Sequence, residues 1–228
     1  MDTSGPDGSA QRPAEVVAWI GSLCEQGVRA SGVDGAGVSV IALSGGPQPV
    51  MSTDERSAVI EDLQFTLGEG PCFDATSHRS PVLISDLTRH EEGVASRWPA
   101  FLNEAVAAGV RAVFAFPLGM GATTVGTLDL YRSTPGPLSE QQLNASLVTA
   151  DSIGVALLTK DPVATLEQSS RLRMTVHQAA GMVMVQTGGT IGDALLLLRA
   201  SAYGEGRSIN DIAADVLAGR RRYDEEQS

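Results

Sequence analysis

Cysteine and histidine are scarce in this chain of 228 residues. The two cysteines, Cys24 and Cys72, are too few for a disulfide scaffold or for a zinc site built from thiolates. The three histidines lie far apart in the sequence and do not form the close pairs of common metal-binding motifs. We therefore expect no structural metal, no cofactor and no disulfide between the two cysteines.

Long apolar segments are also missing. No run approaches the roughly 18 to 20 apolar residues that a membrane-spanning helix needs. The first residues, MDTSGPDGSAQRP, have neither the basic flank nor the apolar core of a signal peptide. These absences predict a cytoplasmic protein with no membrane partner. Residues 1–12 are rich in Gly, Ser, Asp and Pro, and we expect them to be disordered.

Positive charge is scarce in the chain as a whole, whose formal net charge is −11. This balance argues at first against a nucleic-acid partner, because lysine and arginine drive phosphate binding. The distribution is uneven, however. Residues 171–223 hold seven arginines and no lysine against four acidic residues, whereas residues 1–170 are strongly acidic and residues 224–228 form an acidic tail. The arginine-rich segment is therefore a candidate for nucleic-acid contacts.

Five strand patterns lie within residues 13–160, joined in part by short turns that contain glycine. They cover residues 37–44, 48–53, 81–87, 111–119 and 124–132. Helical patterns lie before, between and after them. This arrangement predicts an α+β domain with a mainly antiparallel sheet.

The helices of this domain are expected in four main places. One runs from Pro13 to about Gly32, and one over 54–68 has Val59, Leu63 and Leu67 at helical spacing. Residues 96–110 predict a single helix that ends at Gly109. Ser139 and Gln142 form a capping box that opens a further helix to about Thr159.

Residues 161–223 predict a small all-α module of three helices. Asp161 and Pro162 are suited to begin the first helix, which can continue to Gln186 with Gly188 as its cap. The segment TIGD (190–193) caps a second helix that stops at Gly204. The segment SIND (208–211) caps a third.

Gly181 interrupts the first of these helices. Glycine inside a helix costs about 1 kcal/mol relative to alanine, so the position suggests that something comes close to the backbone there. The second helix of the module and an RNA partner are both candidates. Three methionines nearby, Met174, Met182 and Met184, are expected to fill gaps in the core.

Both parts of the chain resemble known domains. VHQAAGMVMVQTGGTIGDALLLLRASA (176–202) with SINDIAADVL (208–217) resembles the ANTAR domain, a three-helix RNA-binding module of transcription antiterminators. The segments LGEGPCFDA, PVLISDL, RWPAF, GVRAVFAFPL and GTLDLYR are similar to the GAF domains that precede ANTAR in many actinobacterial regulators. The resemblance implies a sensor domain over 13–160 and an ANTAR domain over 161–223.

This resemblance implies a regulator rather than an enzyme. The ANTAR domain would bind stem-loop RNA in a nascent transcript, and loop bases are accessible to side chains. The GAF domain would respond to an unknown small-molecule or redox signal. ANTAR proteins typically present two modules to two RNA loops, so we expect a homodimer in which Ala150, Ile153 and Leu157 are shared between the core and the partner.

The RNA-binding candidates are arginines, an amide and a patch of small residues on the module. They are Arg171, Arg173, Gln178, Ala179, Ala180, Gly181, Arg199 and Arg207. Many ANTAR domains carry lysine where this chain has Ala180, which removes one phosphate contact. The arginines can equally be ordinary solvated residues, and Gln178 can equally bond a backbone group.

The candidates for a GAF ligand site are Cys72, Phe73, Asp129 and Tyr131. Cys72 stands at an expected helix start, where a thiol pKa tends to fall, although a small buried hydrophobic role fits as well. Asp129 and Tyr131 share one face of a strand. The NKFDE-type signature of GAF domains that bind cyclic nucleotides is absent, so no such ligand is assumed.

Two other functions fit parts of the sequence. Some GAF-like domains reduce methionine sulfoxide with cysteine chemistry, for which Cys24 and Cys72 would be the attacking and resolving thiols. Alternatively, three short helices suit a DNA-binding protein. The third helix would be the recognition helix of such a protein and should be basic, but it carries two aspartates and no basic residue.

Overall fold

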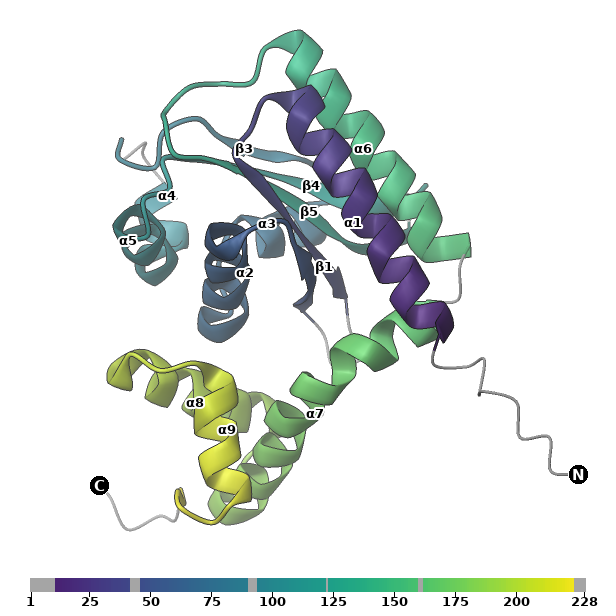
Figure 1. Ribbon diagram of the computed structural model, residues 1–228. Coiled ribbons are helices and arrows are strands. Elements are labelled where there is room, and N and C mark those ends of the chain that lie inside the picture. Colours follow the sequence, from purple (N-terminus) through teal and green to yellow (C-terminus); the bar gives the residue numbers. More distant parts are fainter. Residues whose placement is uncertain (1–10, 42–45, 90–93, 122, 160–161, 224–228) are drawn as a thin grey trace, which may run out of the picture. The chain divides into compact units, whose positions relative to one another are not determined.

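The computed structural model describes residues 11–41, 46–89, 94–121, 123–159 and 162–223 (Figure 1). Side chains are described in these ranges except at 11–15, 94–95 and 162–174. Two compact units divide the chain. The N-terminal unit comprises Met1–Phe65 and Glu69–Gln168, and the C-terminal unit comprises Thr66–Gly68 and Ser169–Ser228.

A five-stranded antiparallel sheet forms the centre of the N-terminal unit, with the strand order β2-β1-β5-β4-β3. Its strands are β1 (Gly35–Ile41), β2 (Pro47–Ser52), β3 (Val82–Ile84), β4 (Ala112–Met120) and β5 (Thr123–Arg132). The α+β fold, its five strands and the antiparallel pairing are therefore as the sequence predicted.

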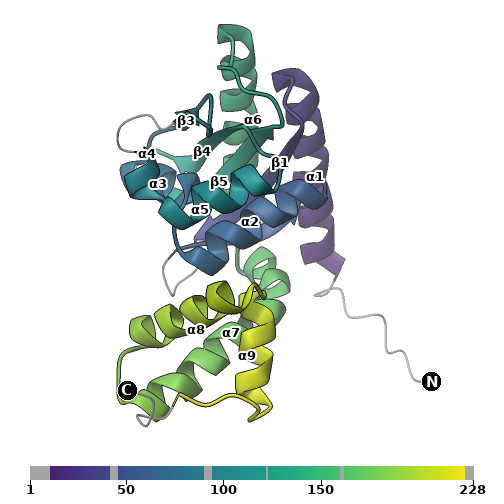
Figure 2. The same ribbon diagram turned by 90° about the vertical axis from the view of Figure 1, so that its left-hand side faces the viewer.

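Helices cover both faces of this sheet. The helices α1 (Gln11–Ser31) and α6 (Glu140–Thr159) lie side by side on one face (Figures 1 and 2). On the other face lie α2 (Glu55–Leu67), α3 (Pro71–His78), α4 (Val94–Arg97) and α5 (Pro99–Ala107). The first residues expected to be disordered, 1–10, are outside the described part, whereas residues 11 and 12 belong to α1.

The main apolar core lies between the sheet and the pair α1 and α6. Val38, Phe116 and Leu128 contribute to it from the strands, and Ile20 and Ile153 from the helices. Because successive side chains of a strand point to opposite faces, the neighbours of these strand residues face the other helical layer.

Helix α6 approaches the sheet closely at Gly154. A Cβ atom at this position would lie 2.8 Å from the backbone nitrogen of Gly119 in β4. Ser146 of α6 donates a hydrogen bond of 2.9 Å from its hydroxyl to the hydroxyl of Ser31 in α1. These small residues allow the two helices to pack tightly against the sheet and each other.

The single helix expected over 96–110 is two helices in the structure. Helix α4 ends at Arg97, and α5 begins at Pro99. Trp98 between them has φ −137° and ψ 62°. The residue before a proline is disfavoured in the α region, which explains the break.

Three helices form the C-terminal unit: α7 (Pro162–Thr187), α8 (Ile191–Glu205) and α9 (Ile209–Leu217). The boundary between the two units falls within α7. Val183, Leu198 and Ile212 are fully buried in this part of the chain. The expected cap at Asp161 lies outside the described residues.

The remaining caps of these helices are confirmed with one correction. Thr190 and Asp193 form a reciprocal capping box, and the Ser208 hydroxyl accepts a hydrogen bond from the backbone of Asp211. The expectation that α8 stops at Gly204 is wrong, because the left-handed cap is Gly206, with φ 60°. A residue in this conformation ends a helix, and Gly204 is an ordinary helical residue.

Across the described residues, no single helix has both the length and the apolar character of a membrane span. The segments Thr175–Thr187 and Ile191–Glu205 reach those limits only as a pair that is bent by 107°.

The contact at Gly154 predicts that alanine is poorly tolerated there. Gly154→Ala should lower the free energy of unfolding by about 1–3 kcal/mol, because the added methyl group meets the β4 backbone, which has no room to yield. Urea unfolding followed by circular dichroism measures this loss.

The matched control is Gly21→Ala in α1. There the added carbon meets only the end of the Met51 side chain, at 3.5 Å. This variant should keep or slightly raise the stability, because alanine favours helix formation. An equal loss in both variants would show that the contact between Gly154 and Gly119 is not the cause.

Candidate functional site

A small cavity lies on the face of the sheet opposite the main core. Its volume is about 10 Å³, which is close to the space of one water molecule. The register pairs Gly37 of β1 with Asp129 of β5, and both residues line the cavity. Its other lining residues are Ser57, Ile60, Glu61, Gln64, Pro71, Phe101, Val113, Leu130 and Tyr131.

Glu61 enters this site from α2 and is 2% exposed. The hydroxyl of Ser39 in β1 donates a hydrogen bond to its Oε2 atom. Gly37 makes room for the carboxyl group, since a Cβ atom there would lie 2.4 Å from Glu61 Oε1. The glycine is therefore required by the close approach of a carboxyl group to the strand.

Asp129 is the second buried acid and is 8% exposed. The Nε2 atom of Gln64 donates a hydrogen bond of 3.3 Å to its Oδ2 atom. The Oε1 atom of Gln64 in turn accepts one of 2.8 Å from the backbone nitrogen of Cys72. A single amide side chain thus connects β5, α2 and the start of α3.

Three buried oxygen atoms at this site have no hydrogen-bond partner among the described residues. They are Glu61 Oε1, Asp129 Oδ1 and Thr127 Oγ1. Within the same part of the chain, neither carboxyl group forms a salt bridge with an arginine. These groups lie close enough to bond one another once a carboxyl group is protonated, because Glu61 and Thr127 each form a side-chain hydrogen bond with Asp129.

The two carboxyl groups hold their protons more tightly than usual. Burial raises the pKa of Glu61 well above its ordinary value of 4.5, and the charge of Asp129 raises it further. Burial also raises the pKa of Asp129 from 3.8 to about 6, although polar neighbours, Glu61 first among them, oppose this shift. The two carboxyl groups therefore titrate as an interacting pair, and both keep their protons to a higher pH than an exposed carboxyl group does.

Tyr131 lies at the edge of the cavity. Its hydroxyl donates a hydrogen bond of 3.0 Å to Oδ1 of Asp54, and the guanidinium carbon of Arg56 lies 5.9 Å from the ring centroid. Burial and the bond to Asp54 raise the pKa of Tyr131 to about 12. Arg56 donates to the carbonyl oxygen of Ala108 at 3.0 Å.

The structure brings together two of the four ligand candidates from the sequence. Asp129 and Tyr131 line the cavity, whereas Cys72 and Phe73 are not among the lining residues, although the backbone of Cys72 bonds to Gln64, which is. The sequence interpretation missed Glu61 and Gln64.

The missed residues follow from the orientation of α2. Its buried side chains include Ser57, Ile60, Glu61 and Gln64, which recur at helical spacing. The apolar face proposed from Val59 is wrong, because Val59 is 44% exposed. The inward face of this helix is largely polar, and that pattern was the available signal.

Both cysteines are free thiols and are buried. Burial raises the pKa of Cys24 to about 12 and also raises the pKa of Cys72. Cys72 lies at a helix start as expected, but removal from water outweighs any lowering of its pKa there. The alternative expectation, a small buried hydrophobic residue, describes Cys72.

The RNA-binding candidates of α7 differ in accessibility. Gln178 is exposed, and a Cβ atom at Gly181 would meet no described atom within 4 Å. Ala179 and Ala180 are fully buried, so their methyl groups offer nothing to a partner outside the chain. The close approach of a second helix to Gly181 is therefore absent from the described structure. The side chains of Arg171 and Arg173 lie outside the described residues.

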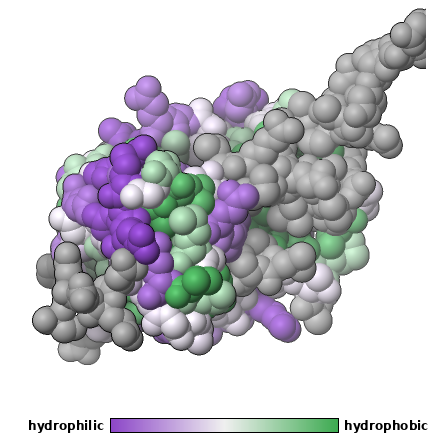
Figure 3. Space-filling model, turned by 90° about the horizontal axis from the view of Figure 1, so that it is seen from below, coloured by the Kyte–Doolittle hydropathy of each residue, from purple (hydrophilic) through white to green (hydrophobic). Residues whose placement is uncertain are grey.

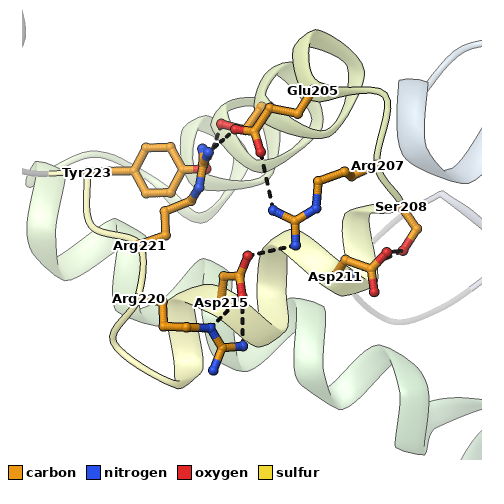
Figure 4. Close-up of polar contacts among 9 residues, drawn as sticks. Glu205, Arg207, Ser208, Asp211, Asp215, Arg220, Arg221 and Tyr223 are labelled. Atoms are coloured by element: carbon orange, nitrogen blue, oxygen red, sulfur yellow. Dashed lines mark hydrogen bonds and ion pairs between the residues drawn. The ribbon is translucent and has the colours of Figure 1, made fainter.

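Arg207 takes part in an ion-pair network (Figure 4). Its Nη1 atom lies 3.3 Å from Glu205, and its Nη2 atom lies 2.7 Å from Asp215. Arg220 pairs with Asp215 at 2.7 Å, and Arg221 pairs with Glu205. The bonds from Arg207 and Arg220 lower the pKa of Asp215. The network engages arginines that the charge distribution alone left free for RNA.

The last candidate, Arg199, is half-buried, and burial lowers its pKa.

Several apolar side chains of α7 are exposed. Met182 and Met184 are 39% and 36% exposed, so the expectation that they fill the core is wrong, and Val185 is 77% exposed. Figure 3 shows apolar surface of this protein bordered by hydrophilic surface.

Comparisons with known proteins match the N-terminal unit. A model of the GAF domain family matches residues 18–158. A GAF domain region from Geobacter sulfurreducens is 14% identical with a TM-score of 0.53, and the match covers 65% of this chain and 96% of that one. No curated protein matches the chain.

Two further solved structures share this fold. The photoproduct state of a GAF domain from Synechocystis is 13% identical with a TM-score of 0.50, and the match covers 65% of this chain and 97% of that one. A type II free methionine-R-sulfoxide reductase from Thermoplasma acidophilum is 15% identical, also at 0.50, with 65% and 96% covered. Identities this low establish the fold alone.

The buried acid pair predicts how stability depends on pH. A carboxyl group whose pKa is raised on folding keeps its proton in the folded state while the unfolded chain loses it, so stability falls as pH rises above 4.5. Glu61→Gln removes this penalty. Its stability relative to the wild type should increase as the pH rises from about 5 to about 7, by at most about 1.4 kcal/mol per pH unit.

Urea unfolding at several pH values measures this difference. Glu104→Gln, which changes an exposed carboxyl group on α5, should follow the wild-type profile. A constant difference between Glu61→Gln and the wild type across this range would contradict a raised pKa of Glu61.

Proposed function

Because the chain belongs to the GAF domain family, we propose that it is a signal-responsive regulator whose N-terminal unit senses a small molecule and whose C-terminal unit binds stem-loop RNA. Binding of the signal would alter the association of the C-terminal unit with a nascent transcript and so control antitermination. Neither unit needs a catalytic step for this role.

The sensing part of the proposal rests on the cavity beneath α2. Enclosed polar groups with a shifted pKa, such as Glu61 and Asp129, are typical of ligand-binding sites. Gln64, which lines the cavity, also joins α2 to the sheet and to α3 through its hydrogen bonds with Asp129 and with the backbone of Cys72. A ligand there would change contacts on three elements of the GAF domain together.

The observation that best supports RNA binding is the open surface at Gly181. Glycine inside a helix is costly, and no described atom of the chain needs the space that its missing side chain leaves. A close approach of RNA to the backbone would account for this glycine. Gly204 of α8 is equally open, so the resemblance to ANTAR domains is what distinguishes Gly181. Gln178 stands one turn earlier on the same face and is exposed, so its amide can bond a base edge. The resemblance to ANTAR domains implies that this partner is RNA.

The arginines of the C-terminal unit would attract the phosphates of RNA and would not distinguish between RNA sequences. Arg207 is held by two carboxylates, but the Arg220 side chain is 63% exposed and can still face a phosphate. Among the described residues, specific contacts therefore fall to Gln178 and to the backbone near Gly181.

A homodimer completes this proposal. Ala150, Ile153 and Leu157, which the sequence suggested as shared with a partner, are buried in the core of the unit itself. Val148 and Val155, two turns apart on α6, are 64% and 43% exposed. These two side chains provide the apolar stripe through which α6 of a second copy would pack.

The alternative functions have less support. Two buried thiols with raised pKa values are poor nucleophiles, which disfavours a sulfoxide reductase that uses Cys24 and Cys72. Helix α9 carries Asp211 and Asp215 and no basic side chain, which disfavours a recognition helix in the major groove of DNA.

The RNA proposal is tested by two glycine variants. Gly181→Ala should raise the free energy of unfolding by about 0.5–1 kcal/mol, because alanine favours the helix and nothing obstructs its methyl group. The same variant should weaken RNA binding at least tenfold if RNA approaches the backbone there. RNA that co-purifies with the full chain provides the ligand for electrophoretic binding measurements.

Gly204→Ala is the control, since it also adds a methyl group in open space within a helix. It should stabilise the protein and leave RNA affinity unchanged. Wild-type affinity in Gly181→Ala would exclude this face as the RNA-binding surface, and the absence of any bound stem-loop RNA at low salt would contradict the function itself.

The dimer is tested by Val148→Asp. A charge in the middle of an apolar interface should shift the protein toward monomers in light scattering, with little effect on the fold because the position is exposed. Asn144→Asp, an exposed change one turn earlier on α6, is the control for added charge. A monomeric wild type at high concentration would contradict the dimer.

A further inference from the structure

The ion-pair network of the C-terminal unit points to an internal control on RNA binding. We infer that two carboxylates, those of Glu205 and Asp215, compete with RNA phosphates for the arginines of this unit. The arginines that they occupy are Arg207, Arg220 and Arg221. This inference rests on the proposed function and adds to it what limits the affinity of the unit for the RNA backbone.

Each carboxylate joins two arginines (Figure 4). The Asp215 carboxylate accepts hydrogen bonds from Nη2 of Arg207 at 2.7 Å and from Nε of Arg220 at 2.8 Å. Glu205 lies 3.3 Å from Nη1 of Arg207 and also pairs with Arg221. Three guanidinium groups thus converge on two carboxylates, and the network keeps one positive charge. Such a cluster binds a phosphate group well once a carboxylate is displaced.

The backbone holds these arginines in place independently of the carboxylates. The backbone nitrogens of Arg220 and Arg221 both donate to the carbonyl oxygen of Asp215, at 2.8 and 3.2 Å. The backbone nitrogen of Arg207 donates to the carbonyl oxygen of Ala202 at 3.0 Å. Removal of a carboxylate should therefore free guanidinium groups without moving the chain that carries them.

Tyr223 fixes the same segment at its other end. Its backbone nitrogen donates a hydrogen bond of 2.9 Å to Oε1 of Gln186 in α7, and its hydroxyl lies 2.7 Å from the hydroxyl of Ser201 in α8. The guanidinium carbon of Arg221 lies 5.6 Å from the tyrosine ring centroid. The segment from Arg220 to Tyr223 is thus bonded to all three helices of the unit, which keeps its arginines beside α8 and α9.

Exposure allows a phosphate to replace the carboxylates. The side chains of Arg207 and Arg220 are 39% and 63% exposed, and that of Glu205 is 36% exposed. Ion pairs in contact with water contribute little to stability, because water and salt screen them. A displaced carboxylate can be hydrated, and a phosphate offers a guanidinium group the same paired oxygen acceptors. Each phosphate contact is therefore weakened by the ion pair that it has to break.

The other two acidic residues within 171–223 have a different role. Asp193 accepts hydrogen bonds from the backbone nitrogen and the hydroxyl of Thr190, and Asp211 accepts one of 2.8 Å from the hydroxyl of Ser208. Both residues thus support the caps of α8 and α9. Asp211 stands one turn before Asp215 on α9 and takes no part in the described ion pairs. It provides a matched control for the loss of one negative charge.

Binding of a synthetic RNA hairpin to the full chain tests the inference. Its sequence can be arbitrary, because phosphate contacts carry no sequence information. Asp215→Asn should raise the affinity about threefold or more in about 50 mM salt, and Glu205→Gln should raise it as well. Asp211→Asn should stay within about twofold of the wild type. Fluorescence anisotropy measures the affinity, and thermal unfolding checks that each variant is folded.

The gain in affinity must depend on the freed arginines. In a background that carries Arg207→Gln and Arg220→Gln, Asp215→Asn should produce no gain beyond that of Asp211→Asn. The gain of Asp215→Asn in the wild-type background should also shrink between about 50 and about 200 mM salt, because phosphate contacts weaken as salt increases.

Three outcomes would overturn the inference. An equal gain in Asp211→Asn would show a general effect of charge, and a gain that persists without the two arginines would place the RNA elsewhere. Unchanged hairpin binding in both Asp215→Asn and Glu205→Gln would show that the ion pairs serve the fold alone. The proposed function is judged separately: a gain for the hairpin, with no stem-loop RNA co-purifying with the full chain, would support the competition and contradict antitermination.

Discussion

The alternation of side chains along β1 and β5 is the constraint on which the N-terminal unit depends. One face of these strands presents Val38 and Leu128 to α1 and α6 and forms the main core. The other face presents Gly37 and Asp129 to the helices that enclose the cavity. Because the period of a strand is two, the residues of the core and those of the site cannot be moved independently. Packing of the apolar face against α1 and α6 therefore fixes the position of Asp129 on the opposite face of the sheet.

This division explains how the fold tolerates a costly site. Two buried carboxyl groups reduce stability, and an apolar pair of the same shape would not. The hydrogen bonds from Ser39 and Gln64 offset only part of the cost. The rest is carried by the apolar core across the sheet. A local violation of packing rules in an otherwise regular fold is where function is expected.

Sequence patterns predicted the secondary structure correctly where a single physical effect determined it. Strand patterns, glycine turns and capping residues such as Thr190 and Ser208 identified the sheet and the helix starts. Asp129 and Tyr131 were found because strand periodicity places them on one face. Cys72 was harder, since a helix start and burial act on its pKa in opposite directions, and only the structure shows that burial dominates.

Helical periodicity failed where the buried face was polar. In α2 an apolar stripe that included Val59 suggested the inward side, but Glu61 and Gln64 face inward because the sheet offers them Ser39 and Asp129. These partners lie far away in the sequence. No local pattern could reveal that their hydrogen bonds would compensate for burial of charged and amide groups.

In the C-terminal unit, the count of arginines did not predict which of them are accessible, because their partners also lie elsewhere in the sequence. Seven arginines gave a basic segment, but Glu205 and Asp215 hold three of them in ion pairs.

Gly154 and Gly181 are both helical glycines with the same intrinsic cost. Gly154 is explained by the β4 backbone 2.8 Å from its missing methyl group, whereas Gly181 faces open space. Packing within the described chain therefore accounts for Gly154 but not for Gly181, and the comparison of Gly181→Ala with Gly204→Ala separates a role of the α7 surface from a helical glycine without one.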